Sequence, residues 1–246
     1  MIELVFLGMG VGALSGFFGI GGGTILVPAL LFIGFDMKMA VGISVMQMVF
    51  SSIYGSYLNL KKGTLDIKMV LMIGLGGFAG ALTSNFIVST LSSTTLEWIF
   101  LGFVLFAMAR MFMHTANHGE TEVKTAHPVI LFAIGMVLGA FSISIGVGGS
   151  ILLVPILAGF LHVPLKNAIS AGLFFVVFSS VSGLISLSIG GHIDYFHGIL
   201  IGMASMVGVF GGIWLKHVVP VVHHKRFLMV FYLIVSSYFV YRLVVA

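Results

Sequence analysis

The sequence predicts an all-helical, polytopic membrane protein, and three observations lead to this fold class. Of 246 residues, 59% are hydrophobic and only 7% are charged, against about 25% charged in an ordinary soluble domain. Apolar stretches of about 20 residues, the length that crosses the hydrocarbon core of a bilayer, follow one another along almost the whole chain. Stretches such as 70–91 are apolar on every face and lack the alternation of a barrel strand. The spans are therefore expected to be helices.

The charged residues and the amino terminus exclude several other classes of protein. The formal net charge of +4 comes from lysines and arginines in short connections, where they bear on orientation in the bilayer. The sequence has no basic face with interleaved aromatic residues that would bind nucleic acid. Residues 1–4 carry no positive charge, so we expect the first apolar run to stay in the mature fold. The chain has no cysteine, which excludes disulfides and thiolate metal sites.

The sequence contains an internal duplication, and each copy is expected to form one structural unit. The predicted units are 1–115 and 128–246, joined by a polar connector at 116–127. After a one-residue insertion the similarity extends to Gly80 and Gly208. The segments that recur most clearly are Gly12-Ala13-Leu14-Ser15, Gly19-Ile20-Gly21-Gly22-Gly23 and Leu26-Val27-Pro28, which return as Gly139-Ala140-Phe141-Ser142, Gly146-Val147-Gly148-Gly149-Ser150 and Leu153-Val154-Pro155.

Each unit is predicted to hold five helical segments in the same order. A first helix at 3–18 is interrupted by glycines and is followed by a shorter helix to about residue 32. Three spans follow at 38–60, 66–91 and 94–114, with breaks at Lys61-Lys62-Gly63 and Ser92-Ser93. In the second unit the corresponding helices are expected at 129–145, 150–161, 166–189, 194–219 and 227–244.

The distribution of lysine and arginine distinguishes two topologies for the glycine-broken segment. If this segment crosses the bilayer, the halves are parallel and the basic residues divide six against five between the two faces. If it enters and returns as a hairpin, the halves are inverted and all eleven basic residues except Lys38 and Arg242 share one face. The positive-inside rule favours the second arrangement. We therefore expect inverted repeats, each a re-entrant hairpin plus three transmembrane helices, with both termini outside the cytoplasm.

The two glycine-rich breaks are the strongest candidates for a binding site. Interrupted helices of inverted repeats meet near the bilayer midplane in secondary transporters, and a helix that begins there presents a positive dipole end and unpaired amides to an anion. Thr24 and Ser150 stand where the short helices begin, and their hydroxyls can cap the helix or donate to a ligand. Pro28 and Pro155 follow within about one turn and are expected to be structural. The alternative is that these glycines only allow close helix packing.

Polar residues on the following helix are further candidates. Gln47 and Ser51 share one face with Ser44 at helical spacing. A buried amide in hydrocarbon is costly without a partner, so Gln47 is expected to face the bundle interior, whether it touches the substrate or only joins helices. Its counterpart in the second half is Phe175. Asn85 is another candidate for lining the path, whereas Ser179, Ser180 and Ser182 are expected to bond to their own helix and Tyr54 and Tyr57 to pack.

Charged and nucleophilic groups argue against other kinds of function. Acidic and basic residues, such as Glu97 and Lys216, fall near the ends of predicted spans, which argues against a deep carboxylate proton relay. The histidines lie in or beside loops without metal-ligand spacing, so no metal or cofactor is expected. The run 223–226 is predicted to be a cytoplasmic anchor in a loop. Ser15 and Ser142 have no base nearby in sequence, and the glycine run follows no strand, so no enzymatic activity is expected.

The motif Gly-x-x-Ser-Gly-x-x-Gly-Ile-Gly-Gly-Gly-x-x-x-Val-Pro at 12–28, echoed at 139–155, resembles that of the TauE/SafE family, the sulfite exporter family of bacterial and archaeal plasma membranes. The resemblance covers nearly the whole chain and implies export of sulfite, a sulfonate such as taurine or sulfoacetate, or a related sulfur-containing anion. It also implies eight transmembrane segments, with each broken element counted as a span. The second copy departs from the motif at Ile143 and Ser150, which replace glycines. The motif residues are Ser15, Gly19, Gly21, Gly22, Gly23 and Pro28, with Ser142, Gly146, Gly148, Gly149 and Pro155.

The sequence therefore predicts a secondary transporter of the cell membrane that holds one small anion between the two glycine-rich breaks. The expected partners are this anion and the lipid bilayer, with no nucleic acid, and the sequence leaves a homo-oligomer open. A passive anion channel that uses the same residues, and a membrane scaffold or partner subunit, stay open as alternatives. The expected substrate-binding residues are Ser15, Gly19, Gly21, Gly22, Gly23, Thr24, Gln47, Ser51, Ser142, Gly146, Gly148, Gly149 and Ser150.

Overall fold

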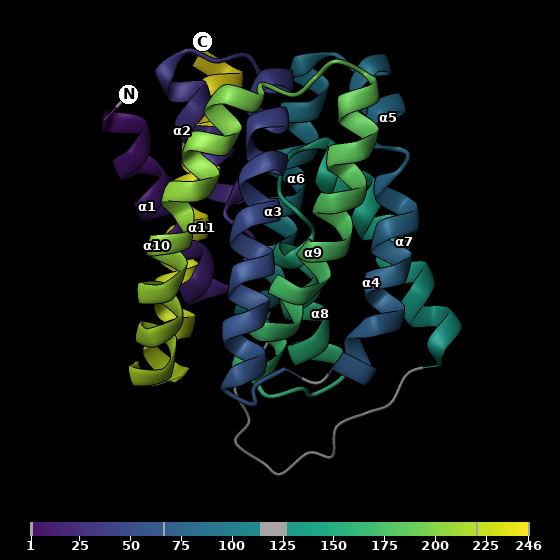
Figure 1. The fold of residues 1–246 in the computed structure, drawn as a ribbon, viewed down its shortest axis with the longest axis vertical. Helices are drawn as coiled ribbons and strands as arrows, with labels where there is room; N and C mark the ends of the chain where they lie inside the picture. The colour runs from purple at the N-terminus through teal and green to yellow at the C-terminus, as the bar shows by residue number, and fades with distance from the viewer. Residues whose placement is uncertain (1, 66, 114–126, 220, 246) are drawn as a thin grey trace.

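The computed structural model describes residues 2–65, 67–113, 127–219 and 221–245, and these residues form eleven helices joined by short connections (Figure 1). Those before the connector are α1 (Ile2–Phe18), α2 (Gly23–Ile33), α3 (Met37–Lys61), α4 (Ile67–Ala81), α5 (Ser84–Thr90) and α6 (Ser93–Met113). Those after it are α7 (Pro128–Ser144), α8 (Ser150–Phe160), α9 (Leu165–Ile189), α10 (Tyr195–Val218) and α11 (Val221–Val245). The predicted all-helical class is confirmed, and the helix bounds agree closely with the sequence predictions for all but two segments.

The first difference is a bend in the span predicted as one helix at 66–91. α4 ends at Ala81, α5 begins at Ser84, and the two axes differ by 41°. Ser186 of α9 stabilises the break, because its Oγ donates to the Leu82 carbonyl at 2.7 Å and accepts from the Asn85 amide at 3.1 Å. A side chain from another helix therefore satisfies backbone groups that the bend takes out of the helical ladder.

The second difference is the start of α11, which begins at Val221 and not near 227. The basic run at 223–226, predicted as a loop, is therefore part of a helix. Lysine and arginine are good helix formers. Their charge indicates position relative to the bilayer, and does not by itself end a helix.

The helix ends gather at two opposite ends of the molecule (Figure 1). α1 begins and α2 finishes at the upper end, whereas α7 begins and α8 finishes at the lower end, where the connector lies. α1 and α2 have 17 and 11 residues, which correspond to about 26 and 17 Å of helix at 1.5 Å per residue. Each pair thus forms a hairpin whose turn lies inside the bundle.

The first helix of each hairpin packs against a helix from the other half of the chain. α1 lies along α10, and α7 lies along α4. Glycines bring the backbones into contact: a β-carbon on Gly16 would lie 2.6 Å from the Val209 carbonyl oxygen, and one on Gly139 would meet the backbone of Gly77. The packing interpretation is therefore right for Gly8, Gly12 and Gly16 of α1, as is usual for small residues between membrane helices.

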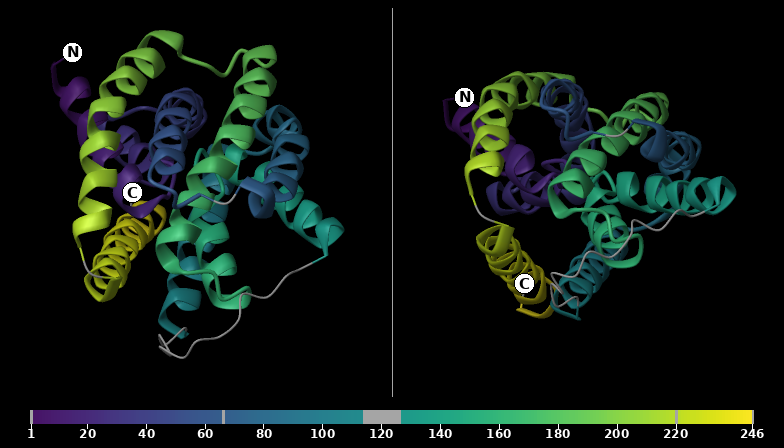
Figure 2. Two further views of the ribbon diagram at one scale, coloured as in Figure 1. Left: turned by 60° about the horizontal axis from the view of Figure 1, so that its bottom comes forward. Right: turned by 90° about the horizontal axis from the view of Figure 1, so that it is seen from below.

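α3 and α9 pack against each other, with α10 beside α3 and α4 beside α9 (Figure 2). α6 and α11 pack together on one side, where the rings of Phe100 and Phe239 stack at 4.3 Å. Three helices, α3, α9 and α10, are long and apolar enough to cross a membrane, and the bent pair α4–α5 makes a fourth if it is one span. With its apolar composition, the chain is a polytopic helical membrane protein.

Candidate functional site

The two helix breaks have the same backbone conformation. α2 begins after Gly22, with φ 75° and ψ −35°, and α8 begins after Gly149, with φ 86° and ψ −17°. L-residues with side chains avoid positive φ at a cost of about 1–2 kcal/mol each. This requirement explains the repeated glycine run. The breaks place six glycines in this region: Gly19, Gly21, Gly22, Gly146, Gly148 and Gly149.

The two breaks, which we call the glycine tips (19–23 and 146–150), meet in the interior of the bundle. A β-carbon on Gly21 would lie 3.4 Å from the Ser150 hydroxyl, and one on Gly23 would collide with the Gly146 carbonyl. Ser44 of α3 joins the tips to the central helices by donating its hydroxyl hydrogen to the Gly146 carbonyl at 2.8 Å. Segments more than 120 residues apart in the sequence thus form one site.

Gln47 lies directly over the first tip. A β-carbon on Gly22 would be 2.6 Å from Gln47 Oε1 and 3.0 Å from Nε2. The side chain is fully buried, and neither amide atom has a hydrogen-bond partner in the described part of the chain. The prediction that Gln47 faces the interior is confirmed. A buried amide without partners costs free energy, so this side chain is available to a bound molecule.

Four further hydroxyl groups at or beside the tips also have no hydrogen-bond partner among the described residues, and their side chains are fully buried. Neither α2 nor α8 has a side-chain cap hydrogen bond, so the capping role considered for the first residues of these helices is not realised. Because buried polar atoms are nearly always satisfied in native proteins, the unpaired hydroxyls make this place the candidate site. They belong to Ser15, Thr24, Ser142 and Ser150.

The other predicted polar residues have structural roles. Ser51 Oγ donates to the Met48 carbonyl of its own helix at 3.3 Å, and Ser179 donates to the Gly148 carbonyl at 3.1 Å, which fixes the second tip. Ser182 donates to the Phe78 carbonyl on α4 at 2.6 Å. Asn85 lies in α5 beside Gly190, away from the tips. The predicted bonding to the residue's own helix is confirmed for Ser179, which also donates to the Phe175 carbonyl at 3.3 Å, and for Ser180, which donates to the Val177 carbonyl at 3.5 Å. It is wrong for Ser182, whose partner lies on another helix. Ser51 makes the same kind of bond within its own helix.

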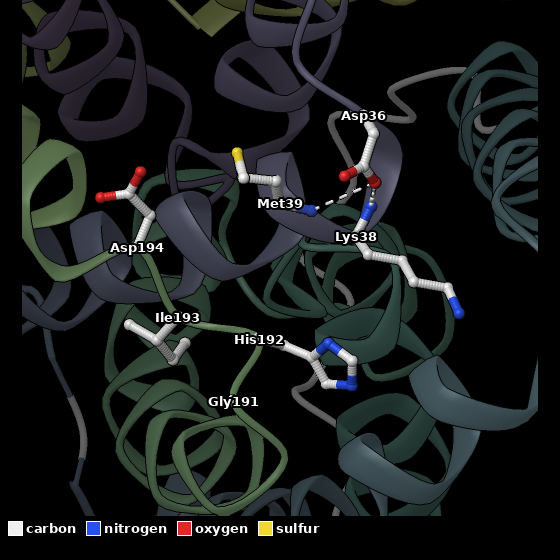
Figure 3. Close-up of a pocket in the computed structure, with 7 residues that line it drawn as sticks. All are labelled: Asp36, Lys38, Met39, Gly191, His192, Ile193 and Asp194. Carbon is white, nitrogen blue, oxygen red and sulfur yellow. Dashed lines mark hydrogen bonds between the residues drawn. The ribbon is translucent and has the colours of Figure 1, made fainter.

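A surface pocket of about 450 Å³ opens at the end of the bundle where α3 begins (Figure 3). The two carboxylates in it cap helices: Asp36 accepts from the amides of Lys38 and Met39, and Asp194 accepts from the His197 amide at 3.1 Å. The pocket contains no tip residue, so it does not reach the buried site. It is lined by Asp36, Lys38, Met39, Gly191, His192, Ile193 and Asp194.

The sequence analysis did not predict the burial of two charged residues, because both lie near helix ends. Lys216, in the last turn of α10, is fully buried and donates to Asn59 Oδ1 at 2.6 Å. Glu97, near the start of α6, is also buried and pairs with Arg242 of α11 at 3.2 Å. The sequence does indicate that Asn59 faces the interior, because this residue continues the spacing of four that starts at Gln47 and Ser51.

The fold and the buried site define the class of protein: a multi-span helical membrane protein with an uncharged polar centre where two interrupted hairpins meet. The family model described as "Sulfite exporter TauE/SafE" matches residues 4–239. The chain belongs to this family of membrane transporters.

Curated relatives from bacteria and archaea share most of the chain. It is 24% identical over 237 residues to the "Probable membrane transporter protein YunE" of Bacillus subtilis, an alignment that covers 86% of this chain and 85% of the relative. It is 33% identical over 195 residues to the "Probable membrane transporter protein MJ0441" of Methanocaldococcus jannaschii, covering 74% and 70%. No solved structure matches the chain.

Proposed function

We propose that this protein is a secondary transporter that exports a small sulfur-containing anion, such as sulfite or a sulfonate, and binds it between the two glycine tips. The observation that carries the proposal is the group of buried polar side chains without partners at the meeting point of two helix N-termini. Membership of the sulfite exporter family supports the class of substrate.

The chemistry of the site suits an oxyanion. Hydroxyl groups on both tips and the Gln47 amide can donate hydrogen bonds to its oxygens, and the starts of α2 and α8 direct positive dipole ends toward the same place. The tip contacts described above come from uncharged groups. Binding by dipoles without a full countercharge is loose enough to allow release, which transport requires.

An inverted repeat is the arrangement that we propose for the two halves. The reciprocal packing of α1 on α10 and of α7 on α4 supports it, as do the two hairpins that enter from opposite ends. The end with the connector carries Lys61 and Lys166, and the other end carries Lys38 and Arg242. By the positive-inside rule the connector end is cytoplasmic and the termini are outside. Rocking of one half against the other would expose the tips to each side in turn.

A passive anion channel would use the same donors as a selectivity filter. A carrier and a channel differ in kinetics, because a carrier shows saturable exchange and is accelerated by anion on the opposite side, whereas a channel does not. A scaffold or partner subunit would show no flux at all. The buried donors favour the carrier, since the surface pocket ends before the tips.

Flux into proteoliposomes tests the proposal. Uptake of sulfite, a sulfonate and chloride would be measured for the parent protein and for Gly22→Leu and Gly148→Leu, whose side chains would strike Gln47 and Met48. Gly10→Leu is the matched control, because a β-carbon there meets nothing within 4 Å. We expect saturable flux of the sulfur oxyanion in the parent and the control, and loss of it in both tip variants that still purify as folded protein. Absence of anion flux in the parent would refute the transporter assignment for these substrates.

A further inference from the structure

Lys216 is a fully buried lysine at the connector end of the bundle. It lies in the last turn of α10, and its side chain is 0% exposed. The side-chain nitrogen donates to Asn59 Oδ1 of α3 at 2.6 Å and to Ser170 Oγ of α9 at 2.9 Å. Three helices, α3, α9 and α10, thus converge on this one side chain.

No carboxylate among the described residues balances the charge of Lys216. Among the described residues, the ion pairs join Asp194 to His197 and Glu97 to Arg242, and neither pair includes Lys216. The charged groups that act on it are themselves positive, namely Lys62 and Lys166, and Lys166 Nζ donates to the neighbouring carbonyl of His217 at 3.3 Å. Burying a cation is costly unless an anion or several acceptors accompany it, and here its protein partners are one amide and one hydroxyl.

Hydrogen-bond donors remain free beside the ammonium group. A lysine has three N–H hydrogens, and two of them are used on Asn59 and Ser170. Asn59 Nδ2 is buried and has no partner in the described chain. The Ser170 hydroxyl hydrogen is engaged by Thr64 or by the Lys166 carbonyl. Lys216 and Asn59 therefore present a charged donor and a neutral donor side by side, an arrangement that suits an oxyanion.

One row of α3 residues connects this place with the tips. Gln47, Ser51, Gly55 and Asn59 follow each other at a spacing of four, and the row from first to last rises about 18 Å at 1.5 Å per residue. Two thirds of the way along it, a β-carbon on Gly55 would lie 3.2 to 3.6 Å from the side chains of Leu173, Val209 and Ile213. This apolar segment separates the two polar places in the structure.

The pseudo-equivalent positions of the other half hold no such group. The alignment that pairs Ser51 with Ser179 places Leu187, Gly42 and Val88 where Asn59, Ser170 and Lys216 stand. All three are buried. The fold thus accommodates an apolar trio at this position, so packing alone does not require the lysine.

We propose that Lys216 and Asn59 form a second anion-binding station, which receives the small oxyanion between the glycine tips and the connector end. The station makes the two ends of the pathway unequal, because the pseudo-equivalent positions at the other end hold Leu187, Gly42 and Val88. The inference rests on the proposed transport function, so its test must separate failure of the station from failure of transport.

Asn59→Asp is the sharpest variant, because it gives Lys216 a counterion without changing the size of the side chain. If the ammonium group receives the substrate, a permanent carboxylate will compete with it, and saturable sulfite flux should fall about tenfold or more, as expected for loss of a charged hydrogen bond. A purely structural role predicts the opposite, since a new ion pair would leave flux and folding intact. Unchanged rate and KM in Asn59→Asp would overturn the station.

Lys216→Cys gives an independent readout, because the chain has no other cysteine. The thiol would be alkylated with 2-bromoethylamine, which restores a cationic side chain through a thioether that sulfite does not cleave, or with neutral iodoacetamide; treated parent protein is the control. We expect the cationic adduct alone to recover flux, and a sulfonate, which does not react with these reagents, to slow the modification. If both adducts behave alike and the sulfonate gives no protection, the station is refuted. If the sulfonate protects the thiol but the parent moves no anion, the station stands and the transport assignment fails.

Discussion

Gln47 and Phe175 lie in the same place in the two halves of the molecule, each against the glycine that begins the short helix of its own half. The Gln47 amide lies over Gly22, and the ring of Phe175 would be 2.5 Å from a β-carbon on Gly149. One tip therefore faces an amide and the other an aromatic ring. The two residues that the internal duplication pairs in the sequence thus each contact the glycine before a short helix, and the amide makes the site more polar beside the first tip.

This asymmetry predicts unequal effects of substitution at the two positions. Gln47→Leu removes the amide donor and should weaken anion binding about 10- to 100-fold, the range for hydrogen bonds to a charged group. Phe175→Leu removes no donor and should lower thermal stability more than it lowers affinity. Equilibrium binding of labelled sulfite and thermal unfolding in detergent would measure both. Equal losses of affinity in the two variants would contradict the assignment of Gln47 as a ligand.

The unpaired hydroxyls predict that their removal lowers anion affinity without lowering the stability of the protein. In Ser15→Ala and Ser142→Ala a buried oxygen without a partner is removed, so stability should stay constant or rise by up to about 1 kcal/mol. Anion affinity should fall in both. If the two hydroxyls serve only the fold, the reverse pattern will appear, with reduced stability and unchanged KM.

The tip conformation predicts a cost for any β-carbon at the start of α8. Gly149→Ala places a side chain at φ 86° and against Phe175, and it should destabilise the protein by at least about 1–2 kcal/mol. Gly211→Ala is the control, because that glycine lies in α10 with open space around it, and alanine there should be neutral or stabilising by about 0.5–1 kcal/mol. Chemical unfolding in mild detergent would compare them. Similar stability of the two variants would show that the backbone at the tip relaxes.

The α10 cap predicts a pH-dependent contribution to stability. Partial burial raises the pKa of Asp194, but hydrogen bonds from the His197 side chain and amide, with the charge of that ring, lower it by more, so the net pKa lies below 3.8. A carboxylate with a lowered pKa in the folded state stabilises the fold above its ordinary pKa and loses this effect as the pH falls through the lowered value. Asp194→Asn keeps an oxygen that can cap the helix but loses the charge, so it should be less stable than the parent by about 0.2–1 kcal/mol near neutral pH. The difference should shrink when thermal unfolding is repeated below pH 4, and a constant difference would count against this cause.

The sequence predicted the tips well because their signal is local. Six glycines at positive φ and the start of a helix after each run follow from backbone sterics alone. The interior position of Gln47 also followed from a simple rule, since an amide group that faces lipid costs free energy. In contrast, the hydrogen bonds of Ser51 and Ser179 depend on rotamers that the pattern of residues does not specify.

What the sequence could not show depends on contacts between distant residues. The bend between α4 and α5 is stabilised by Ser186, about 100 residues further along the chain. Lys216 was placed near a helix end, where a lysine ordinarily reaches solvent. Its burial results from α3 and α9, which supply Asn59 and Ser170 as partners.

Equilibrium binding of radiolabelled sulfite to the purified protein addresses the anion site between the tips most directly. The parent should bind sulfite saturably. The triple variant Ser15→Ala/Gln47→Leu/Ser142→Ala should lose that binding while it keeps the size-exclusion elution profile and the helical content of the parent. Retention of the parent affinity in this variant would contradict a site between the glycine tips.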